Sequence, residues 1–353
     1  MNQKILGQRI QIAKKWPLRI INFAPYSYQK SFLIKHACEK PAPLFDVGKT
    51  LTDSHKILLV APSSFQELLI AFPILQCIWQ NLPNKELFVL TPLEHMPFLQ
   101  AVLDAEKVIT YDPNDLFWDE KNYQDLRTLL KGHHFDIILN LQNDTPPLIS
   151  VALRSANPKL SLAISSGKMV SFANLTVTAQ EPYNLLRHYS LILDVWRFSN
   201  HPLTLQWQPL NSDTLNLNEA QNRIRQIGLV PKQFSIFLWQ IGDEDRQKRA
   251  FALARKEMQT AGVRPLFLYS GSTSPEALTE FHSLPQLGGS SIGKMLALFA
   301  QAVKVYGCQG DLWHLANLID VPLHGYFREA EAPFDTAFFN PRCTVEYLDI
   351  PEA

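Results

Sequence analysis

The stretch KILLVAPSSFQELLIAFPIL, Lys56–Leu75, carries the clearest indication of the fold class. An apolar run of strand length follows Lys56, and from Glu67 the apolar residues have the spacing of an amphipathic helix. A buried strand that passes through a short polar turn into a helix is typical of an α/β domain. Glu67 lies where the helix begins. A carboxylate there is either a charge favourable to the helix dipole or a residue of an active site.

The same alternation of short apolar runs and helical patterns continues through the first half of the chain. Because the apolar runs are nearly continuous, they predict a parallel sheet covered by helices on both faces. The predicted strands are 56–62, 86–92, 107–112, 135–142 and 160–165, and the predicted helices are 67–82, 96–104, 123–132 and 146–156.

A second α/β series follows a polar stretch at 200–218. Its predicted strands are 234–239, 264–271, 303–309 and 321–327, and its predicted helices are 245–262, 292–302 and 311–320, the first of them ending at Gly262. We therefore expect a basic N-terminal extension (1–50), a first Rossmann-like domain (51–200), a linker (201–218) and a second Rossmann-like domain with a tail (219–353). Such domains bind ligands at the carboxyl ends of their strands, in the cleft between them.

Composition excludes several classes of protein. The 353 residues are 46% hydrophobic with a formal net charge of zero, so nothing in the overall charge favours nucleic acid. No run of 18 apolar residues could span a bilayer, and the N-terminus has no uninterrupted apolar core of a signal peptide. The four cysteines are far apart and form no CxxC pair, which predicts free thiols, a cytoplasmic protein and no metal site. They are Cys38, Cys77, Cys308 and Cys343.

The first 50 residues differ from the rest. They contain nine Lys and Arg residues against Glu39 and Asp46, a net charge of +7, with aromatic residues interleaved. Such a segment can lie against an anionic membrane surface. The alternative is a solvated extension that packs on its own domain, and Pro17 and Pro25 break any helical periodicity.

Three motifs have simpler interpretations. Gly288–Met295 fits the phosphate-binding P-loop except at Met295, where Ser or Thr is needed to hold Mg²⁺, so we reject an NTPase. His133 and His134 have no carboxylate or Cys at ligand spacing, so a surface turn is predicted. The charged run Asp243–Arg249 predicts a solvated helix start. The alternative is that one of its cations, Arg246, Lys248 or Arg249, reaches a phosphate.

The stretch VYGCQGDLWHLANLIDVPLHGYF, Val305–Phe327, carries the strongest indication of a ligand. A strand enters a tight glycine-containing turn and then a helix, which is the geometry that places an anion on a helix N-terminus. His314 lies on that helix, where a packed histidine is the alternative to a functional one.

Taken together, these stretches resemble glycosyltransferase family 9, the ADP-heptose:lipopolysaccharide heptosyltransferases, from about Lys56 to Phe327. The family has a Ser-rich turn followed by Gly-Asp at the start of the first helix, and ILLVAPSSFQELLIAFPIL matches with Gln66 and Glu67 at those two positions. FDIILNLQND resembles the family's fourth strand and its polar end. The second half resembles the segment with Asp-Ser/Thr-Gly-x-x-His-Leu-Ala, of which His314, Leu315 and Ala316 match.

The resemblance implies a GT-B fold, and inverting sugar transfer from a nucleotide diphosphate donor to a lipopolysaccharide or other surface-glycan acceptor, with no metal or other cofactor. It makes Glu67 the base that takes the acceptor hydroxyl's proton, with Ser63, Ser64 and Gln66 on the acceptor side. Residues at the donor site would be Gln309, Gly310, Asp311, His314 and Lys248. The enzyme would work in the cytoplasm at the inner-membrane surface.

The chain departs from the family on the donor side. Gln309, Gly310 and Asp311 replace the family's Asp, Ser/Thr and Gly, and no Lys-x-Trp-Pro element is found near 243–250. A carboxylate at Asp311 repels a diphosphate, and as an N-cap it would occupy the amides that the phosphate needs. The alternative is therefore a non-catalytic GT-B-like protein that has lost its donor and binds a protein partner.

Overall fold

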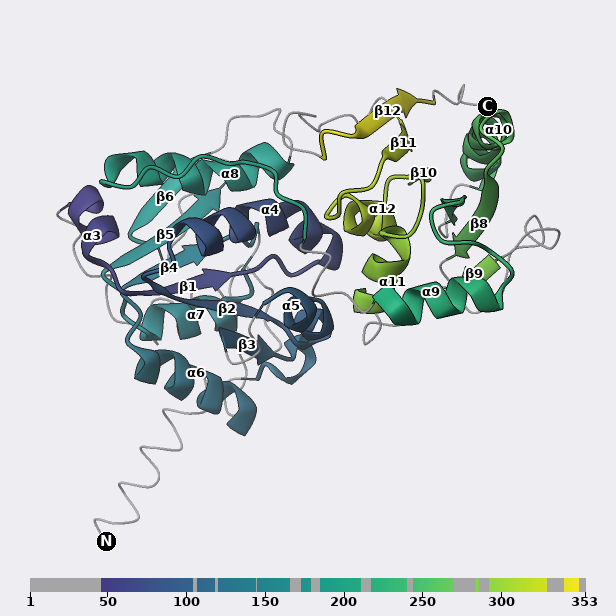
Figure 1. Ribbon diagram of the computed structural model, residues 1–353. Coiled ribbons are helices and arrows are strands. Elements are labelled where there is room, and N and C mark those ends of the chain that lie inside the picture. Colours follow the sequence, from purple (N-terminus) through teal and green to yellow (C-terminus); the bar gives the residue numbers. More distant parts are fainter. Residues whose placement is uncertain are drawn as a thin grey trace, which may run out of the picture.

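The computed structural model describes residues 46–103, 107–117, 120–143, 145–165, 173–178, 185–210, 217–239, 244–269, 283–285, 292–328 and 340–348. These residues form two six-stranded sheets in separate lobes (Figure 1), and every strand pair in both sheets is parallel. The predicted α/β architecture with two Rossmann-like sheets is confirmed. The basic, aromatic segment 1–45 lies outside the described residues.

The first sheet has the strand order β3-β2-β1-β4-β5-β6. Its strands are β1 (Lys56–Val60), β2 (Glu86–Pro92), β3 (Val108–Tyr111), β4 (Ile137–Asn140), β5 (Leu160–Ser165) and β6 (Leu175–Thr178). The helices are α3 (Val47–Asp53), α4 (Phe65–Asn81), α5 (Met96–Val102), α6 (Lys121–His133), α7 (Pro147–Ser155) and α8 (Leu185–Val195), with short 3-10 turns η2 (Leu93–His95), η4 (Pro113–Asp115) and η5 (Trp196–Phe198).

The second sheet has the order β12-β11-β10-β7-β8-β9. Its strands are β7 (Phe234–Trp239), β8 (Arg264–Tyr269), β9 (Ser283–Pro285), β10 (Val305–Cys308), β11 (Leu323–Phe327) and β12 (Cys343–Tyr347). The helices are α9 (Leu217–Gln226), α10 (Glu244–Thr260), α11 (Ile292–Phe299) and α12 (Asp311–Ala316). Gly262 follows α10 with a φ of 66°, as expected of a residue that ends a helix.

Both faces of each sheet are covered, because successive strand residues point to opposite faces. In β1, Ile57 and Leu59 pack with α4 and α8, whereas Leu58 and Val60 pack with α6 and α7. In the second sheet one face packs under α9, α11 and α12, and the other packs under α10. This double covering is what makes the strands almost wholly apolar in sequence.

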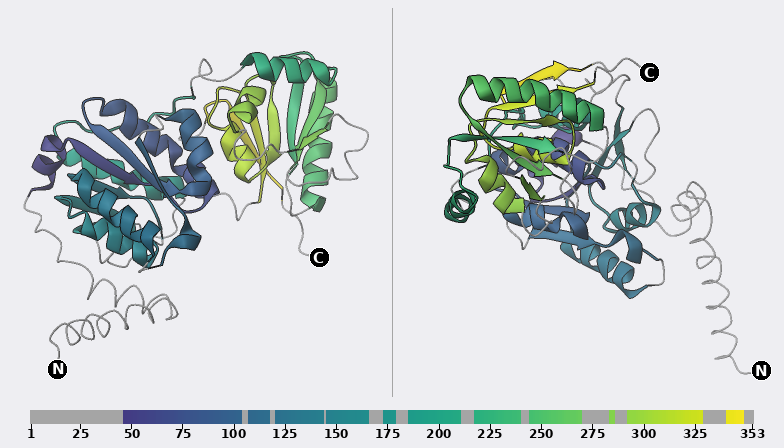
Figure 2. Two further views of the ribbon diagram at one scale, coloured as in Figure 1. Left: turned by 90° about the horizontal axis from the view of Figure 1, so that it is seen from below. Right: turned by 90° about the vertical axis from the view of Figure 1, so that its right-hand side faces the viewer.

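The two lobes are joined by direct packing. α12 packs against α4, and α11 packs against α5, so the largest core cluster of the described residues runs from one lobe into the other. Figures 1 and 2 show α11 and α12 on the side of the second lobe that faces the first. The irregular segment after α8 adds hydrogen bonds, from Leu210 N to Leu318 O (2.7 Å) and from Trp207 Nε1 to Asn317 O (3.3 Å).

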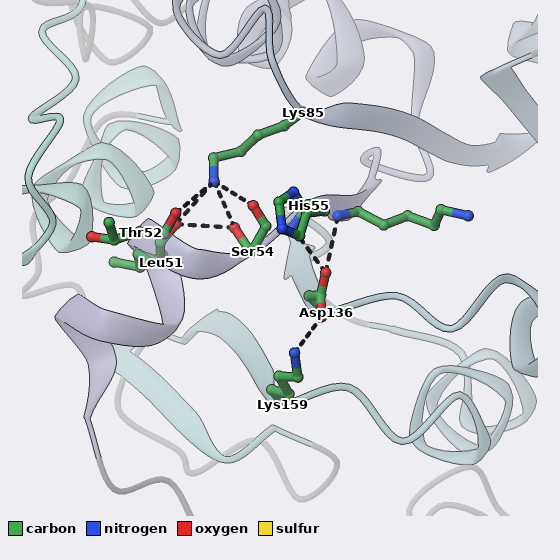
Figure 3. A network of polar contacts seen from close by, with 8 residues as sticks. Leu51, Thr52, Ser54, His55, Lys85, Asp136 and Lys159 are labelled. Atoms are coloured by element: carbon green, nitrogen blue, oxygen red, sulfur yellow. Dashed lines mark hydrogen bonds and ion pairs between the residues drawn. The ribbon is translucent and has the colours of Figure 1, made fainter.

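The beginning of the first sheet is held by a polar network (Figure 3). Lys85 Nζ donates to the backbone oxygens of Leu51, Thr52 and Ser54, at 3.2, 3.2 and 2.5 Å, and so satisfies carbonyls at the end of α3. A carboxylate, Asp136, accepts from the backbone N–H groups of His55 and Lys56 and pairs with Lys159 Nζ at 2.7 Å. These contacts fix α3 and the sheet at the edge opposite the carboxyl ends of the strands.

Several elements were not predicted. They are α3, β6, α8, α9, β9 and β12. The domain boundaries at 50, 200 and 218 remain predictions: the first falls inside α3, and α9 already begins at Leu217.

Candidate functional site

The first candidate site lies at the switch point of the first sheet. The chain leaves β1 to build β2 and β3 on one side, and returns to place β4 on the other side. In a doubly wound sheet, ligands bind outside the carboxyl ends of the two strands that flank this point. A ligand of this sheet would therefore meet the residues that follow β1 and β4, and Glu67 and Asn143 are among them.

Glu67 lies in the first turn of α4, and its side chain turns away from the helix cap. Ser64 is the N-cap residue, and its Oγ accepts from the backbone N–H of Glu67 at 3.1 Å. A Ser-x-x-Glu sequence commonly closes a capping box, in which the Glu side chain accepts from the N-cap N–H. Instead, Glu67 Oε1 lies 3.5 Å from Asn143 Nδ2, at the end of β4. The partly exposed carboxylate therefore reaches across the switch point.

Asn143 and Tyr189 complete this cluster. Asn143 Nδ2 also lies 3.4 Å from the hydroxyl of Tyr189, a fully buried side chain on α8. The polar end of FDIILNLQND pointed toward Asn143 without assigning it a role, whereas nothing in the sequence pointed to Tyr189, because α8 was not predicted. The cluster can orient Glu67 through an amide N–H.

Behind the cluster, a buried hydrogen-bonded network holds the end of β4. Asn140 Nδ2 donates to Thr145 Oγ1 at 2.8 Å, and Gln142 Nε2 lies 2.9 Å from the hydroxyl of Tyr111. Burial raises the pKa of Tyr111, so this phenol stays protonated. The network holds the backbone on both sides of Gln142. It thereby holds the position of the next residue, Asn143.

The residues predicted on the acceptor side surround the start of α4. Ser63 and Ser64 are exposed, and Gln66 is half-buried. Between them, Phe65 packs against His95 and Phe98, with ring centroids 5.7 and 5.8 Å apart, and this packing anchors the first turn of the helix. The structure thus places Ser63, Ser64 and Gln66 beside Glu67 at the same sheet edge.

The second candidate site lies at the switch point of the second sheet, between β10 and β7. Gln309 and Gly310 follow β10, and α12 begins at Asp311. Gly310 is the N-cap residue of α12, with φ 156° and ψ 179°, a conformation open mainly to glycine. The prediction that Asp311 caps this helix is wrong: it is the first helical residue, and the cap has no side-chain hydrogen bond.

Asp311 and Gln309 still give this site a character different from the family pattern. Burial raises the pKa of the Asp311 carboxyl, because the ionised form loses solvation. Gln309 Oε1 is buried, and no hydrogen-bond partner for it is present in the described part of the chain. At the carboxyl ends of β10 and β7, these two side chains offer an acid and a hydrogen-bond acceptor. An anionic nucleotide sugar bound there would instead need groups that donate hydrogen bonds.

The other predicted donor-site residues have structural surroundings. His314 is 2% exposed, and its ring packs edge-on against Trp313. Burial lowers the pKa of His314 to about 3, so the ring is neutral. Lys248 is exposed and pairs with Glu244 of its own helix at 3.1 Å, whereas its neighbour Arg246 is buried.

The other motifs add no chemistry. His134 ends α6 in a left-handed conformation, as a turn residue does. In the P-loop-like stretch, Ile292–Met295 lie in α11, and 288–291 lie outside the described residues. Within the described ranges no cluster of three potential metal ligands occurs, and no helix there has both the length and the apolar character to cross a bilayer.

Comparison with known proteins gives a fold. No family model and no curated protein matches the sequence. A glycosyl transferase family 9 protein from Veillonella parvula is similar in structure, with a TM-score of 0.63 and 14% identity over 86% of this chain and 88% of that one. ADP-heptose LPS heptosyltransferase II from E. coli gives a TM-score of 0.60 and 15% identity over 82% of this chain and 90% of that one.

A third similar structure is E. coli heptosyltransferase WaaC with ADP, with a TM-score of 0.58 and 14% identity over 83% of this chain and 93% of that one. All three matches span both lobes of this chain. The chain therefore has the GT-B fold of the family 9 glycosyltransferases, the fold that its sequence resemblance to that family implies.

Proposed function

We propose that the protein is an inverting, metal-independent glycosyltransferase that moves a heptose-like sugar from a nucleotide diphosphate donor to a lipopolysaccharide or other surface-glycan acceptor. The observation that supports this most is the position of Glu67. Its carboxylate leaves the helix cap and meets Asn143 across the switch point, which is where a GT-B acceptor domain needs a base.

In the proposed reaction, a Glu67 oxygen takes the proton of the acceptor hydroxyl. The acceptor oxygen forms a bond to the anomeric carbon from the face opposite the diphosphate. The bond from that carbon to the phosphate oxygen breaks, and the nucleoside diphosphate leaves with the electron pair, so the anomeric configuration inverts. The Asn143 amide keeps the carboxylate directed toward the acceptor.

The donor would lie at the second switch point, against Gln309, Gly310 and Asp311. His314 and Lys248 are not among the proposed donor contacts, because His314 is buried and Lys248 is paired with a residue of its own helix. Arg246 is the better candidate cation, since it lies buried in the first turn of α10, the helix that follows β7. With a surface-glycan acceptor, the enzyme would work in the cytoplasm beside the inner membrane, and residues 1–50 would be the segment that meets the membrane.

Glu67→Gln tests the proposal, because it keeps the shape of the side chain and removes the base. Thermal-shift titrations with ADP, UDP, GDP and CDP first identify the donor nucleotide; a ligand at a hundredfold over its Kd stabilises a fold by about 2.7 kcal/mol. With the corresponding nucleotide sugar, Glu67→Gln should lose at least about a hundredfold in kcat and keep its nucleotide-induced shift. Glu67→Asp, which retains a carboxylate, should be intermediate. Equal turnover by wild type and Glu67→Gln would contradict the proposed base.

A second candidate function is favoured by Asp311. Its carboxylate lies where the donor diphosphate would approach α12, and burial strengthens the repulsion between the two because less water screens them. On this hypothesis the protein is a non-catalytic GT-B scaffold that binds a protein partner. A protein that melts cooperatively and shows no shift with any of the four nucleotides would support the scaffold over the transferase.

A further inference from the structure

A cavity of about 550 Å³ lies between α4, the end of α5 and the irregular segment after α8, and no residue of either candidate site lines it. The second half of α4 contributes Phe72, Gln76, Trp79 and Gln80 to its wall. Residues 101–103, at the end of α5, and residues 208–210, in the irregular segment after α8, complete the lining. Its size is within the range of small-molecule sites in proteins.

The wall of this cavity has three amide side chains, on Gln76, Gln80 and Gln208. Gln76 is half-buried, whereas Gln80 and Gln208 are exposed, and none of the three makes a side-chain hydrogen bond within the described chain. Trp79 adds an indole, and Lys107 Nζ lies 5.6 Å from the centre of its ring. None of the described lining residues carries a charge.

This combination selects one class of ligand. An amide offers both a donor and an acceptor, as a hydroxyl group does, so three amides can bind a ring that carries several hydroxyls. The indole offers an apolar surface for the C–H face of such a ring. A charged ligand would lose hydration without gaining a counter-charge from the lining residues, since the nearby Lys107 ammonium contacts the Trp79 ring and is not part of the lining.

The cavity is a separate place from the proposed catalytic site. Gln76 follows Glu67 by nine residues in the same helix, which corresponds to about 14 Å along the helix axis. One wall, at Leu210, is hydrogen-bonded to Leu318 just beyond α12. A molecule in the cavity would therefore contact α4 of the first lobe and the segment tied to the second.

We infer that this cavity is a binding site for an uncharged saccharide, held between the Trp79 indole and the amides of Gln76, Gln80 and Gln208. The inference does not depend on the proposed transfer reaction, because no donor nucleotide and no Glu67 chemistry enters it. Its occupant would contact α4, the end of α5 and the segment after α8.

The experiment follows the indole N–H signals of the full-length protein by ¹H–¹⁵N NMR, with the Trp79 signal identified by its loss in Trp79→Phe. The probes are methyl α-D-glucopyranoside and methyl β-D-galactopyranoside, with glucose 6-phosphate as the charged comparison. At least one neutral glycoside should shift the Trp79 signal in a saturable way below about 50 mM. Gln76→Leu, which keeps the size of the side chain, should weaken the apparent Kd by about fivefold.

Two further variants control the result. Gln208→Leu lies in a segment without helix or strand, so it should weaken binding without disturbing a helix. Gln259→Leu, exposed on α10, should bind as the wild type does. The inference is overturned if neither glycoside shifts the signal, if the shift persists unchanged in both Gln76→Leu and Gln208→Leu, or if the phosphorylated sugar binds as tightly as the neutral ones.

Discussion

At the scale of single residues, Asn143 determines how Glu67 can act. Its amide N–H lies 3.5 Å from the carboxylate oxygen and 3.4 Å from the Tyr189 hydroxyl, so it is shared between an acid and a buried phenol. Asn143 is thus a positioning residue for the proposed base.

Asn143→Ala should lower kcat by about tenfold to a hundredfold, because the carboxylate loses the amide that directs it toward the acceptor. Asn122→Ala, on the exposed first turn of α6, is a matched control and should keep the wild-type kcat. An unchanged kcat in a folded Asn143→Ala variant would mean that Asn143 does not position Glu67.

Asp311 is the acidic residue of the second candidate site. Because burial already raises the pKa of this carboxyl, a bound diphosphate raises it further, and anion binding is accompanied by proton uptake. Nucleoside diphosphate affinity should therefore rise as pH falls from about 8 to about 5.5. Asp311→Asn should bind more tightly at the higher pH and show a flatter pH dependence.

Calorimetric titration of wild type and Asp311→Asn with ADP or the nucleotide found by thermal shift measures both effects. Asp245→Asn, at the exposed start of α10, provides a carboxylate-to-amide control on a helix that packs on the other face of the sheet. If Asp311→Asn binds no better than the wild type at any pH, then the repulsion by Asp311 is not what limits the donor site.

At the scale of elements, Lys85 is the clearest example of one side chain holding a helix. Its ammonium group donates to three carbonyls and to the Ser54 hydroxyl at the end of α3 (Figure 3), and burial lowers its pKa. Lys85→Met keeps most of the stem and removes every donor. It should lower the free energy of unfolding by about 1–3 kcal/mol, because carbonyls at the helix end are left unpaired.

Hydrogen exchange should show this loss first in α3, with the amides of β1 less affected, since Asp136 still accepts from His55 and Lys56. Lys121→Met, at the exposed start of α6, is the matched control and should stay close to wild type in urea unfolding. Uniform loss of protection across the first lobe would show that Lys85 supports the whole sheet and not one helix.

The elements also show which parts of the fold the sequence predicts. β2 (Glu86–Pro92), β5 (Leu160–Ser165) and β7 (Phe234–Trp239) have the predicted bounds, because strands buried on both faces leave continuous apolar runs. The missed strand β6 (Leu175–Thr178) lies at a sheet edge and is half-exposed, so its pattern is weak. α8 follows β6 and was not predicted either. Nothing in the sequence therefore pointed to Tyr189, which lies on α8.

The candidate site was predictable only in part for the same reason. Glu67 follows a strong strand and begins a strong helix, so its position at the sheet edge could be predicted. Its contact with Asn143 joins residues 76 positions apart and depends on β4 pairing with β1. The choice of Gly310 over Asp311 as the N-cap depends on backbone angles that a carboxylate preference alone does not fix.

At the scale of the whole molecule, buried histidines set an acid limit. His95 and His188 are 1% and 2% exposed, and burial lowers the pKa of each to about 4. Because the folded pKa lies below that of the unfolded chain, the unfolded state takes up protons first as pH falls. Stability is fully present above about pH 6.5 and is lost toward pH 4, by on the order of 3 kcal/mol for each histidine.

Urea unfolding at about pH 7 and about pH 5 measures this loss. His95→Phe should flatten the dependence, since the introduced phenyl ring could still pack against Phe65 and would bind no proton. Glu94 lies 3.6 Å from His95 Nε2 but is exposed, so it should stabilise the protonated form of His95 only weakly. His201→Ala, at the surface, should keep the wild-type pH dependence. An unchanged pH dependence in His95→Phe would exclude His95 as a source of the acid sensitivity.

The shared core predicts how the two lobes unfold. The largest apolar cluster runs through both lobes, and Trp207 and Leu210 are hydrogen-bonded to the end of α12. Loss of one lobe would expose the apolar faces of α4 and α5 or of α11 and α12. Urea unfolding followed by tryptophan emission and by circular dichroism should therefore give one coincident transition, which is not the rule for chains of this length.

Trp207→Ala should separate the two probes, because it removes the half-buried indole whose N–H donates to Asn317 O. Phe198→Ala removes an aromatic side chain that is 73% exposed and should leave the transitions coincident. Two transitions in the wild-type chain would mean that the shared core does not couple the lobes. Each lobe would then unfold independently of the other.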